Sequence, residues 1–439
     1  MRDMSACTEL NIDLRQMILA IETAVSLVGM NDTNHGKRVG YIASQIGHQL
    51  GYSEQDLQYC FELGLLHDCG VSTEQMHSSL ANHFDWNDAH IHCDVGHRLL
   101  KDFEPLARFA KPILYHHTPW ASLVDADLSA FDANMANLVF LSDRVDVMAA
   151  SHYSSDILLA KEQIVAAIKG YTGTYFDPAL VNAFLAVERS EAFWIALEDR
   201  HISRYTWDMG QLESNTLLSL PQVRQLSLIM SYIVDQKSPF TARHSVRVAD
   251  LAKYLAMSYG LSPAQCEKVE IAGLMHDLGK LHMPDDILEK PGPLNATERS
   301  IMNQHSYETF EILRHIKGLG EIAKWAAFHH EGINGAGYPF HPSERDLSTE
   351  ARIIAVADVF QALAQNRPYR ERLPLDEVIR IVRRQAADGR LDSTIVELAI
   401  NRAETCYEIA IGQSAQFNQA HIDLYPERAR TGGSTPHVI

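Results

Sequence analysis

Residues 273–280 read GLMHDLGK, and this stretch decides the interpretation of the chain. A histidine followed at once by an aspartate places an imidazole beside a carboxylate, and both groups are ligands of zinc, iron, manganese and nickel. The first half of the chain has a matching stretch at residues 64–71, which read GLLHDCGV. The two stretches predict two copies of one fold, each built around a metal site.

More histidines and an aspartate follow in the same order in both halves. The candidate ligands of the second half are His244, His276, Asp277, His305, His329, His330 and Asp358. Those of the first half are His35, His67, Asp68, His92, His116, His117 and Asp143. In both series the first two histidines are 32 residues apart, and the third and fourth are 24 apart. Such agreement is improbable by chance and indicates a domain duplication of about 200 residues per copy.

Both copies have the sequence pattern of helices. Apolar residues recur every three to four positions, and alternating strand patterns are scarce, so we expect an all-α fold. Ser262-Pro263 is typical of a helix N-cap followed by a first-turn proline. We also expect Gly279 and Pro284 to end the helix that carries His276. We divide the chain into a domain at 1–205, a second domain at 206–420 and a poorly ordered tail at 421–439.

Composition excludes several classes of function. The 439 residues carry a net charge of −18, which argues against duplex nucleic acid or an anionic membrane surface as a partner. No apolar run is long enough to span a bilayer, and residues 1–10 lack a signal-peptide core. The six cysteines form no CxxC motif, so we expect a cytoplasmic protein.

The second series of ligands suits two metal ions. One ion would take His244, His276, Asp277 and Asp358, and the other would share Asp277 with His305, His329 and His330. Two ions about 3.5–4 Å apart hold a hydroxide and clamp a phosphoryl group for in-line attack. Lys280, three residues after Asp277, could offset charge on the phosphate or on the leaving oxygen.

Further motifs make the second half resemble the HD-GYP family. The match covers roughly residues 225 to 415. It begins with HDLGK at 276–280, MPD at 283–285 and KPG at 290–292, and it continues with HHE at 329–331, GAGYP at 335–339, ADVF at 357–360 and RPY at 367–369.

The resemblance implies a phosphodiesterase that opens cyclic di-GMP or 3′,3′-cyclic GMP-AMP to a linear 5′-phosphorylated dinucleotide. It implies a centre of two divalent ions, iron or manganese before nickel. The seven residues of the second series would be the ligands, with Lys280 and Asp277 as catalytic residues. The substrate would contact Gly337, Tyr338, Pro339, Arg367 and Arg370.

Three positions depart from the family pattern. Asn334 replaces an aspartate in the loop before the Gly-Tyr-Pro turn. Gln361 stands where an aspartate is common; we interpret this as the loss of a carboxylate near a guanine-reading position, which favours the cyclic GMP-AMP hybrid. Phe240 occupies the place of a glutamate that would support a third metal, so we expect two ions.

The first half resembles the broader HD superfamily over roughly residues 15 to 190. It keeps all seven ligand-type residues, but Val71 takes the place of Lys280 and the Gly-Tyr-Pro loop is missing. Three hypotheses stay open. The domain could be a pseudoenzyme that scaffolds a homodimer, a metal-bearing sensor, or a 5′-nucleotidase acting on the linear product.

Two alternatives also stay open for the second half. It could be an inactive module that binds a cyclic dinucleotide and signals through protein contacts, although the intact ligands and Lys280 argue against this. It could also be another HD-type nucleotide phosphohydrolase, which the Gly-Tyr-Pro loop disfavours. The sequence leaves the oligomeric state open, with a homodimer among the options.

Overall fold

The computed structural model describes residues 12–28, 34–71, 90–123, 126, 128–211, 216–237, 243–366 and 370–414. Within them helices dominate, so the predicted all-α class is confirmed. The strands of this part of the chain form one antiparallel pair, β1 (Ile12–Asp13) with β2 (Leu217–Leu218). The predicted tail, Arg367 and Phe240 lie outside the described residues. Among the described helices none is both long and apolar enough to cross a membrane.

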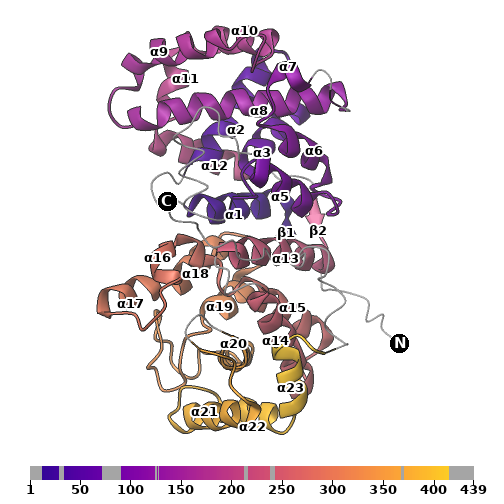
Figure 1. Cartoon of the computed structure of the whole chain (residues 1–439), viewed down its shortest axis with the longest axis vertical. Coiled ribbons are helices and arrows are strands. Elements are labelled where there is room, and N and C mark those ends of the chain that lie inside the picture. The colour runs from indigo at the N-terminus through magenta and orange to yellow at the C-terminus, as the bar shows by residue number, and fades with distance from the viewer. Residues whose placement is uncertain are drawn as a thin grey trace, which may run out of the picture.

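The first half of the chain forms a bundle of helices above the junction in Figure 1. Its elements are α1 (Leu14–Ser26), α2 (His35–Gln49), α3 (Glu54–Leu66), α5 (His90–Leu100), α6 (Ala107–Tyr115), α7 (Trp120–Leu123), α8 (Ala130–Ala149), η1 (Ala150–His152), α9 (Ile157–Gly170), α10 (Pro178–Val187), α11 (Glu191–Ile195) and α12 (Asp199–Gln211).

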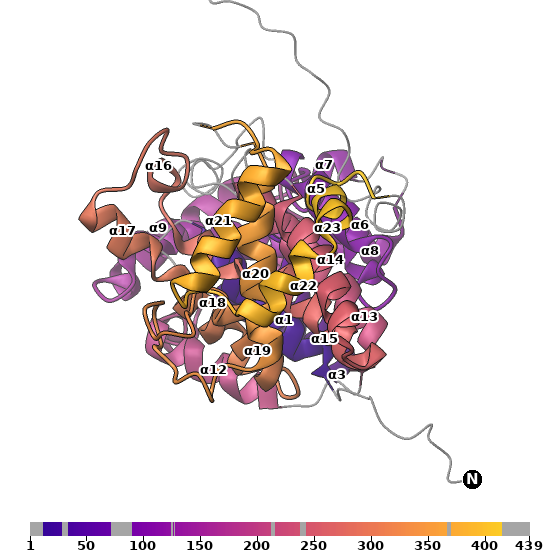
Figure 2. The same cartoon turned by 90° about the horizontal axis from the view of Figure 1, so that it is seen from below.

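The second half forms a similar bundle below the junction, and Figure 2 shows α21 and α22 lying over α20 at its far end. Its helices are α13 (Leu220–Lys237), α14 (His244–Tyr259), α15 (Pro263–Met275), η2 (Leu278–His282), α16 (Asp285–Leu288), α17 (Ala296–Met302), α18 (His305–Arg314), α19 (Gly320–Ala327), α20 (Thr349–Ala364), α21 (Leu375–Ala387), α22 (Ser393–Ile400) and α23 (Ala403–Ala410).

The N-terminal helix α1 lies at the junction and packs against both halves (Figure 1). On one side it contacts α2 and α3, and on the other it contacts η2 and α18. Hydrogen bonds that involve side chains also cross the junction: the amide of Lys317 donates to Oε1 of Gln16 at 2.8 Å, and Nε2 of Gln225 donates to the carbonyl of Asp102 at 3.1 Å. Helix α1 of the first half therefore covers η2 and α18, two elements of the second half that carry candidate site residues.

The local signals around α15 are partly as predicted. Oγ of Ser262 accepts from the amide of Gln265, and the reciprocal bond completes a capping box, so the predicted N-cap is confirmed. The predicted helix end is wrong, because α15 already stops at Met275. Gly279 has another role: a Cβ there would lie 1.9 Å from the carbonyl oxygen of His305, so glycine is needed for η2 to approach α18.

Candidate metal centres

The seven predicted ligands of the second half come from five separate places in the fold. His244 and His305 open α14 and α18, and Asp358 lies within α20. The pair His276-Asp277 joins α15 to η2, and the pair His329-His330 follows α19. The structure brings the side chains together in overlapping groups, which are His244 with His276 and Asp358, His276 with Asp277 and His329, and His305 with His329 and His330.

The carboxylate of Asp277 stands between two sets of histidines. Its Oδ2 lies 3.4 Å from Nε2 of His244 and 3.2 Å from Nε2 of His276. Its Oδ1 lies 3.6 Å from Nε2 of His305 and 3.8 Å from Nε2 of His329. Because one carboxylate faces both sets with different oxygens, Asp277 has the geometry of a ligand shared by two ions.

Backbone contacts fix the orientation of most of these imidazoles. Nδ1 of His276, His305 and His329 each lies 2.7 Å from the carbonyl oxygen three residues earlier in the chain. A carbonyl oxygen can only accept, so Nδ1 carries the hydrogen and the lone pair of Nε2 faces the cluster. This tautomer leaves Nε2 available to bind a metal ion.

Two buried atoms of this centre have no hydrogen-bond partner. They are Nε2 of His276 and Oδ1 of Asp277. A buried polar atom without a partner costs about 1–3 kcal/mol, and a cation at the centre would satisfy both atoms. The donor set of imidazoles and carboxylates therefore fits divalent transition metals.

The electrostatics of the centre favour an ionised Asp277 and neutral His305 and His330. Burial opposes ionisation of Asp277, but His276 and Lys280 hold its pKa well below the ordinary value. Burial lowers the pKa of His305 to about 4 and that of His330 to about 3. His244 differs: burial acts to lower its pKa, but Asp277 and Asp358 raise it to about 9.

Lys280 and the Gly-Tyr-Pro loop border this cluster. Nζ of Lys280 donates to Oδ2 of Asp277 at 2.5 Å. The ring of Tyr338 lies 4.9 Å from that of His330, and a Cβ at Gly337 would lie 2.4 Å from the carbonyl oxygen of His330. The loop thus packs against His330, which places Gly337, Tyr338 and Pro339 beside the candidate metal site.

Sequence reasoning assigned no role to Glu331, which holds this loop. Its side chain is buried, and Oε1 accepts from the amides of Phe340 at 2.6 Å and His341 at 3.2 Å. The carboxylate follows His330 directly, so it ties the far side of the Gly-Tyr-Pro turn to the ligand pair.

Arg370 makes contacts within the protein. Its guanidinium donates to the carbonyls of Leu363 at 3.2 Å and Ala362 at 2.8 Å, and so caps the last turn of α20. Its contact with substrate stays a prediction, as does that of Arg367, which lies outside the described residues.

The expected role of Gln361 near the nucleobase is wrong. The side chain is fully buried, and its Oε1 lies 2.6 Å from Nδ1 of His244, behind the cluster. Gln361 orients a candidate ligand, so it gives no ground for a base preference.

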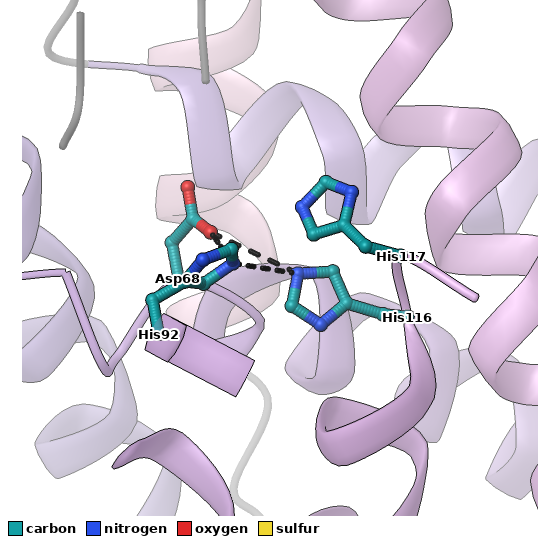
Figure 3. A group of neighbouring side chains, drawn as sticks. All are labelled: Asp68, His92, His116 and His117. Atoms are coloured by element: carbon teal, nitrogen blue, oxygen red, sulfur yellow. Dashed lines mark hydrogen bonds and ion pairs between the residues drawn. The ribbon is translucent and has the colours of Figure 1, made fainter. Parts of the chain in front are cut away.

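The first half repeats the arrangement (Figure 3). Oδ1 of Asp68 lies 3.3 Å from Nε2 of His92 and 3.9 Å from Nε2 of His116, and His117 completes this group. On the other side, Oδ2 of Asp68 lies 3.8 Å from Nε2 of His35. His35 groups with two further candidate ligands, His67 and Asp143. All seven predicted residues therefore converge here too.

The two centres differ in the basic side chain that contacts a candidate ligand. Val71, at the position of Lys280, is fully buried. Arg144 instead donates from Nη2 to Oδ2 of Asp143 at 2.8 Å, and its side chain is only 2% exposed. Each centre thus pairs one aspartate with a cation, and in the first half that cation comes from α8.

Comparison with known proteins agrees with this duplicated architecture. HD domain family models match residues 33–150 and 228–395. The 3′3′-cGAMP-specific phosphodiesterase 1 of Vibrio cholerae is 36% identical over 92% of this chain and 95% of its own length. The chain belongs to the HD-GYP family of phosphodiesterases.

The chain is also similar to other cyclic dinucleotide phosphodiesterases. The cyclic di-GMP phosphodiesterase of Thermotoga maritima is 36% identical over 40% of this chain and 48% of its own length. The crystal structure of a cyclic GMP-AMP specific phosphodiesterase of V. cholerae, V-cGAP3, covers 92% of this chain with a TM-score of 0.61 and 23% identity, which supports the shared fold. HD domains are metal-dependent, in keeping with the two histidine and aspartate clusters.

Proposed function

We propose that the second half hydrolyses 3′3′-cyclic GMP-AMP to the linear 5′-phosphorylated dinucleotide. Cyclic dinucleotide phosphodiesterase activity follows from the family, and the choice of substrate rests on the relative that aligns along 95% of its own length. Cyclic di-GMP is the competing substrate, because other relatives carry that name.

The observation that carries this proposal is the position of Asp277 between two histidine sets. His244, His276 and Asp358 would hold one ion with Oδ2 of Asp277, and His305, His329 and His330 would hold the other with Oδ1. We propose iron or manganese at both positions, with nickel as a further option. Bound ions would supply an activated water nucleophile and neutralise charge on the phosphate.

The protein's own groups would then orient the substrate. Lys280 lies at the rim with its ammonium group on Asp277, where it would stabilise charge that develops on the phosphate or the leaving oxygen. Gly337, Tyr338 and Pro339 would form the wall beside His330. We propose Arg367 and Arg370 as further substrate contacts.

We also propose that the first half binds metal and acts as a 5′-nucleotidase on the linear product. Nε2 of His67 is buried without a hydrogen-bond partner, as is Nε2 of its counterpart His276. The linear dinucleotide carries a terminal phosphate that a single metal centre can remove. The domains proposed for these activities are 1–205 and 206–420, in a cytoplasmic protein that could form a homodimer.

A product assay tests both proposals. Full-length protein with Mn²⁺ or Fe²⁺ is given cyclic GMP-AMP, cyclic di-GMP and cyclic di-AMP separately, and the products are separated by mass. We expect cyclic GMP-AMP to be opened fastest, with loss of opening in Asp277→Ala. A product without its 5′-phosphate would support the nucleotidase. No turnover of any ring by metal-loaded protein would favour the binding module over the enzyme.

A further inference from the structure

Two candidate ligands, His35 and His244, are oriented by a side chain and not by a backbone carbonyl. Nδ1 of His67 and His116 lies 2.7 Å from the carbonyl oxygen three residues earlier, as it does in the three second-half histidines described above. His35 and His244 each form the first residue of a helix, α2 and α14. A side chain contacts Nδ1 of each of these two imidazoles.

In the second half that side chain is a neutral amide. Oε1 of Gln361 lies 2.6 Å from Nδ1 of His244, and Nε2 of the same amide donates to the carbonyl of Ala410 at 3.4 Å. The bond to Ala410 fixes which end of the amide faces the histidine. Gln361 therefore accepts the Nδ1 hydrogen of His244 without carrying a charge.

In the first half the corresponding partner is a carboxylate. Oδ2 of Asp146 lies 2.7 Å from Nδ1 of His35, and Asp146 is fully buried. Its other oxygen accepts from Nε of Arg38 at 2.6 Å and from the hydroxyl of Tyr153 at 2.5 Å. Arg38 and Tyr153 thus contact one oxygen of Asp146, and the other oxygen faces the histidine.

The two partners have different effects on the imidazole. A carboxylate accepts a hydrogen bond about twice as strongly as a neutral acceptor. A stronger acceptor at Nδ1 raises the basicity of Nε2, which is the atom that faces the metal. The first centre thus has a stronger histidine donor at His35 than the second has at His244.

We propose that the two centres hold their metals unequally, with the first centre the tighter and the second weakened by Gln361. Gln361 is then a positioning residue that sets the metal affinity of the phosphodiesterase centre. Ring opening by the second centre would then depend on the concentration of free metal, whereas the first centre would stay occupied by metal. This inference rests on the ligand sets of the proposed function.

Site-isolated variants of the full chain test the inference. His67→Ala/Asp68→Ala leaves only the second centre, and His276→Ala/Asp277→Ala leaves only the first. Mn²⁺ affinity is measured for each by competition with a chromophoric chelator. We expect the first centre to bind at least about tenfold more tightly, on the scale typical of changes in ligand-orienting partners.

Substitutions at Gln361 then test whether this residue causes the difference in Mn²⁺ affinity. Gln361→Glu keeps the length and adds charge, so the second centre should bind Mn²⁺ more tightly. Gln361→Leu removes the acceptor and should weaken binding by about 10–100-fold. Both substitutions should leave the affinity of the first centre unchanged, and circular dichroism checks folding. If Gln361→Leu does not fold, the test rests on whether Gln361→Glu increases the Mn²⁺ affinity of the second centre.

The outcomes separate this inference from the proposed function. Equal affinities of the two centres, or a second centre that Gln361→Glu leaves unchanged, would overturn the inference alone. A second centre that binds no Mn²⁺ in any background would overturn the proposed metal centre itself.

Discussion

Nζ of Lys280 contacts the same carboxylate oxygen of Asp277 that faces His244 and His276. The lysine side chain is 16% exposed, whereas that of Asp277 is 2% exposed, so the ammonium group lies on the outer side of the candidate metals. The ammonium group therefore lies between the candidate metal site and solvent, where it could contact a phosphate bound to the metals. Lys280 thus has the position expected of a group that stabilises a reacting phosphate.

Replacing Lys280 by methionine should therefore lower kcat by about 10²–10³-fold, the cost typical of removing one transition-state donor. The substitution keeps most of the side-chain length and removes the charge. Metal content, measured by elemental analysis, should not fall. Lys290→Met is the matched control, because Lys290 pairs with Glu298, which is not a candidate ligand. Equal losses in both variants would contradict a specific role for Lys280.

Glu331→Ala should raise KM and lower kcat together. Removing the carboxylate leaves the amides of Phe340 and His341 without their acceptor, at a cost of about 1–3 kcal/mol each where they stay buried. The Gly-Tyr-Pro turn would then be less firmly held over His330. Glu321→Ala, on the exposed side of α19, serves as the control. Steady-state kinetics that match those of the control would rule out this role.

Metal affinity of the second centre should rise with pH. The pKa of His244 is raised to about 9 by Asp277 and Asp358, against the effect of burial, so His244 is protonated at neutral pH in the metal-free protein. A metal must displace that proton, so affinity should increase by up to about tenfold per pH unit and level off above the pKa. Chelator competition between pH 6.5 and 9 measures the slope. His244→Ala should flatten it, and a flat profile in the unsubstituted protein would contradict the prediction.

His67→Ala/Asp68→Asn should separate the two activities. Both residues belong to the first centre, so ring opening by the second should change little. Release of inorganic phosphate from the linear dinucleotide should fall to background. The double variant is compared with His48→Ala, a substitution in the last turn of α2. Phosphate release at the normal rate in the double variant would end the nucleotidase hypothesis.

The sequence allowed the fold class and the convergence of both ligand sets to be predicted. Apolar spacing determines helices locally, and the repeated order of histidines and aspartates links distant helices without any knowledge of their packing. Ser262 could be assigned as an N-cap for the same reason, because a capping box involves only residues close in the chain.

Roles that depend on packing between distant segments could not be predicted. Gln361 is 117 residues from His244, and the sequence does not show which way its amide points. Arg144 follows Asp143 directly, but only the structure shows that its guanidinium turns back onto that carboxylate. The need for glycine at position 279 likewise arises from a carbonyl on a different helix.

The placement of α1 at the junction has a consequence for synthesis of the chain. Strand β1 pairs with β2, about 200 residues later, and α1 packs against η2 and α18, which end at His282 and Arg314. Domains usually fold in order as they leave the ribosome. Here α1 acquires its last neighbours only after residue 314 has been translated. The side of α1 that contacts η2 and α18 in the folded protein therefore lacks these contacts until then.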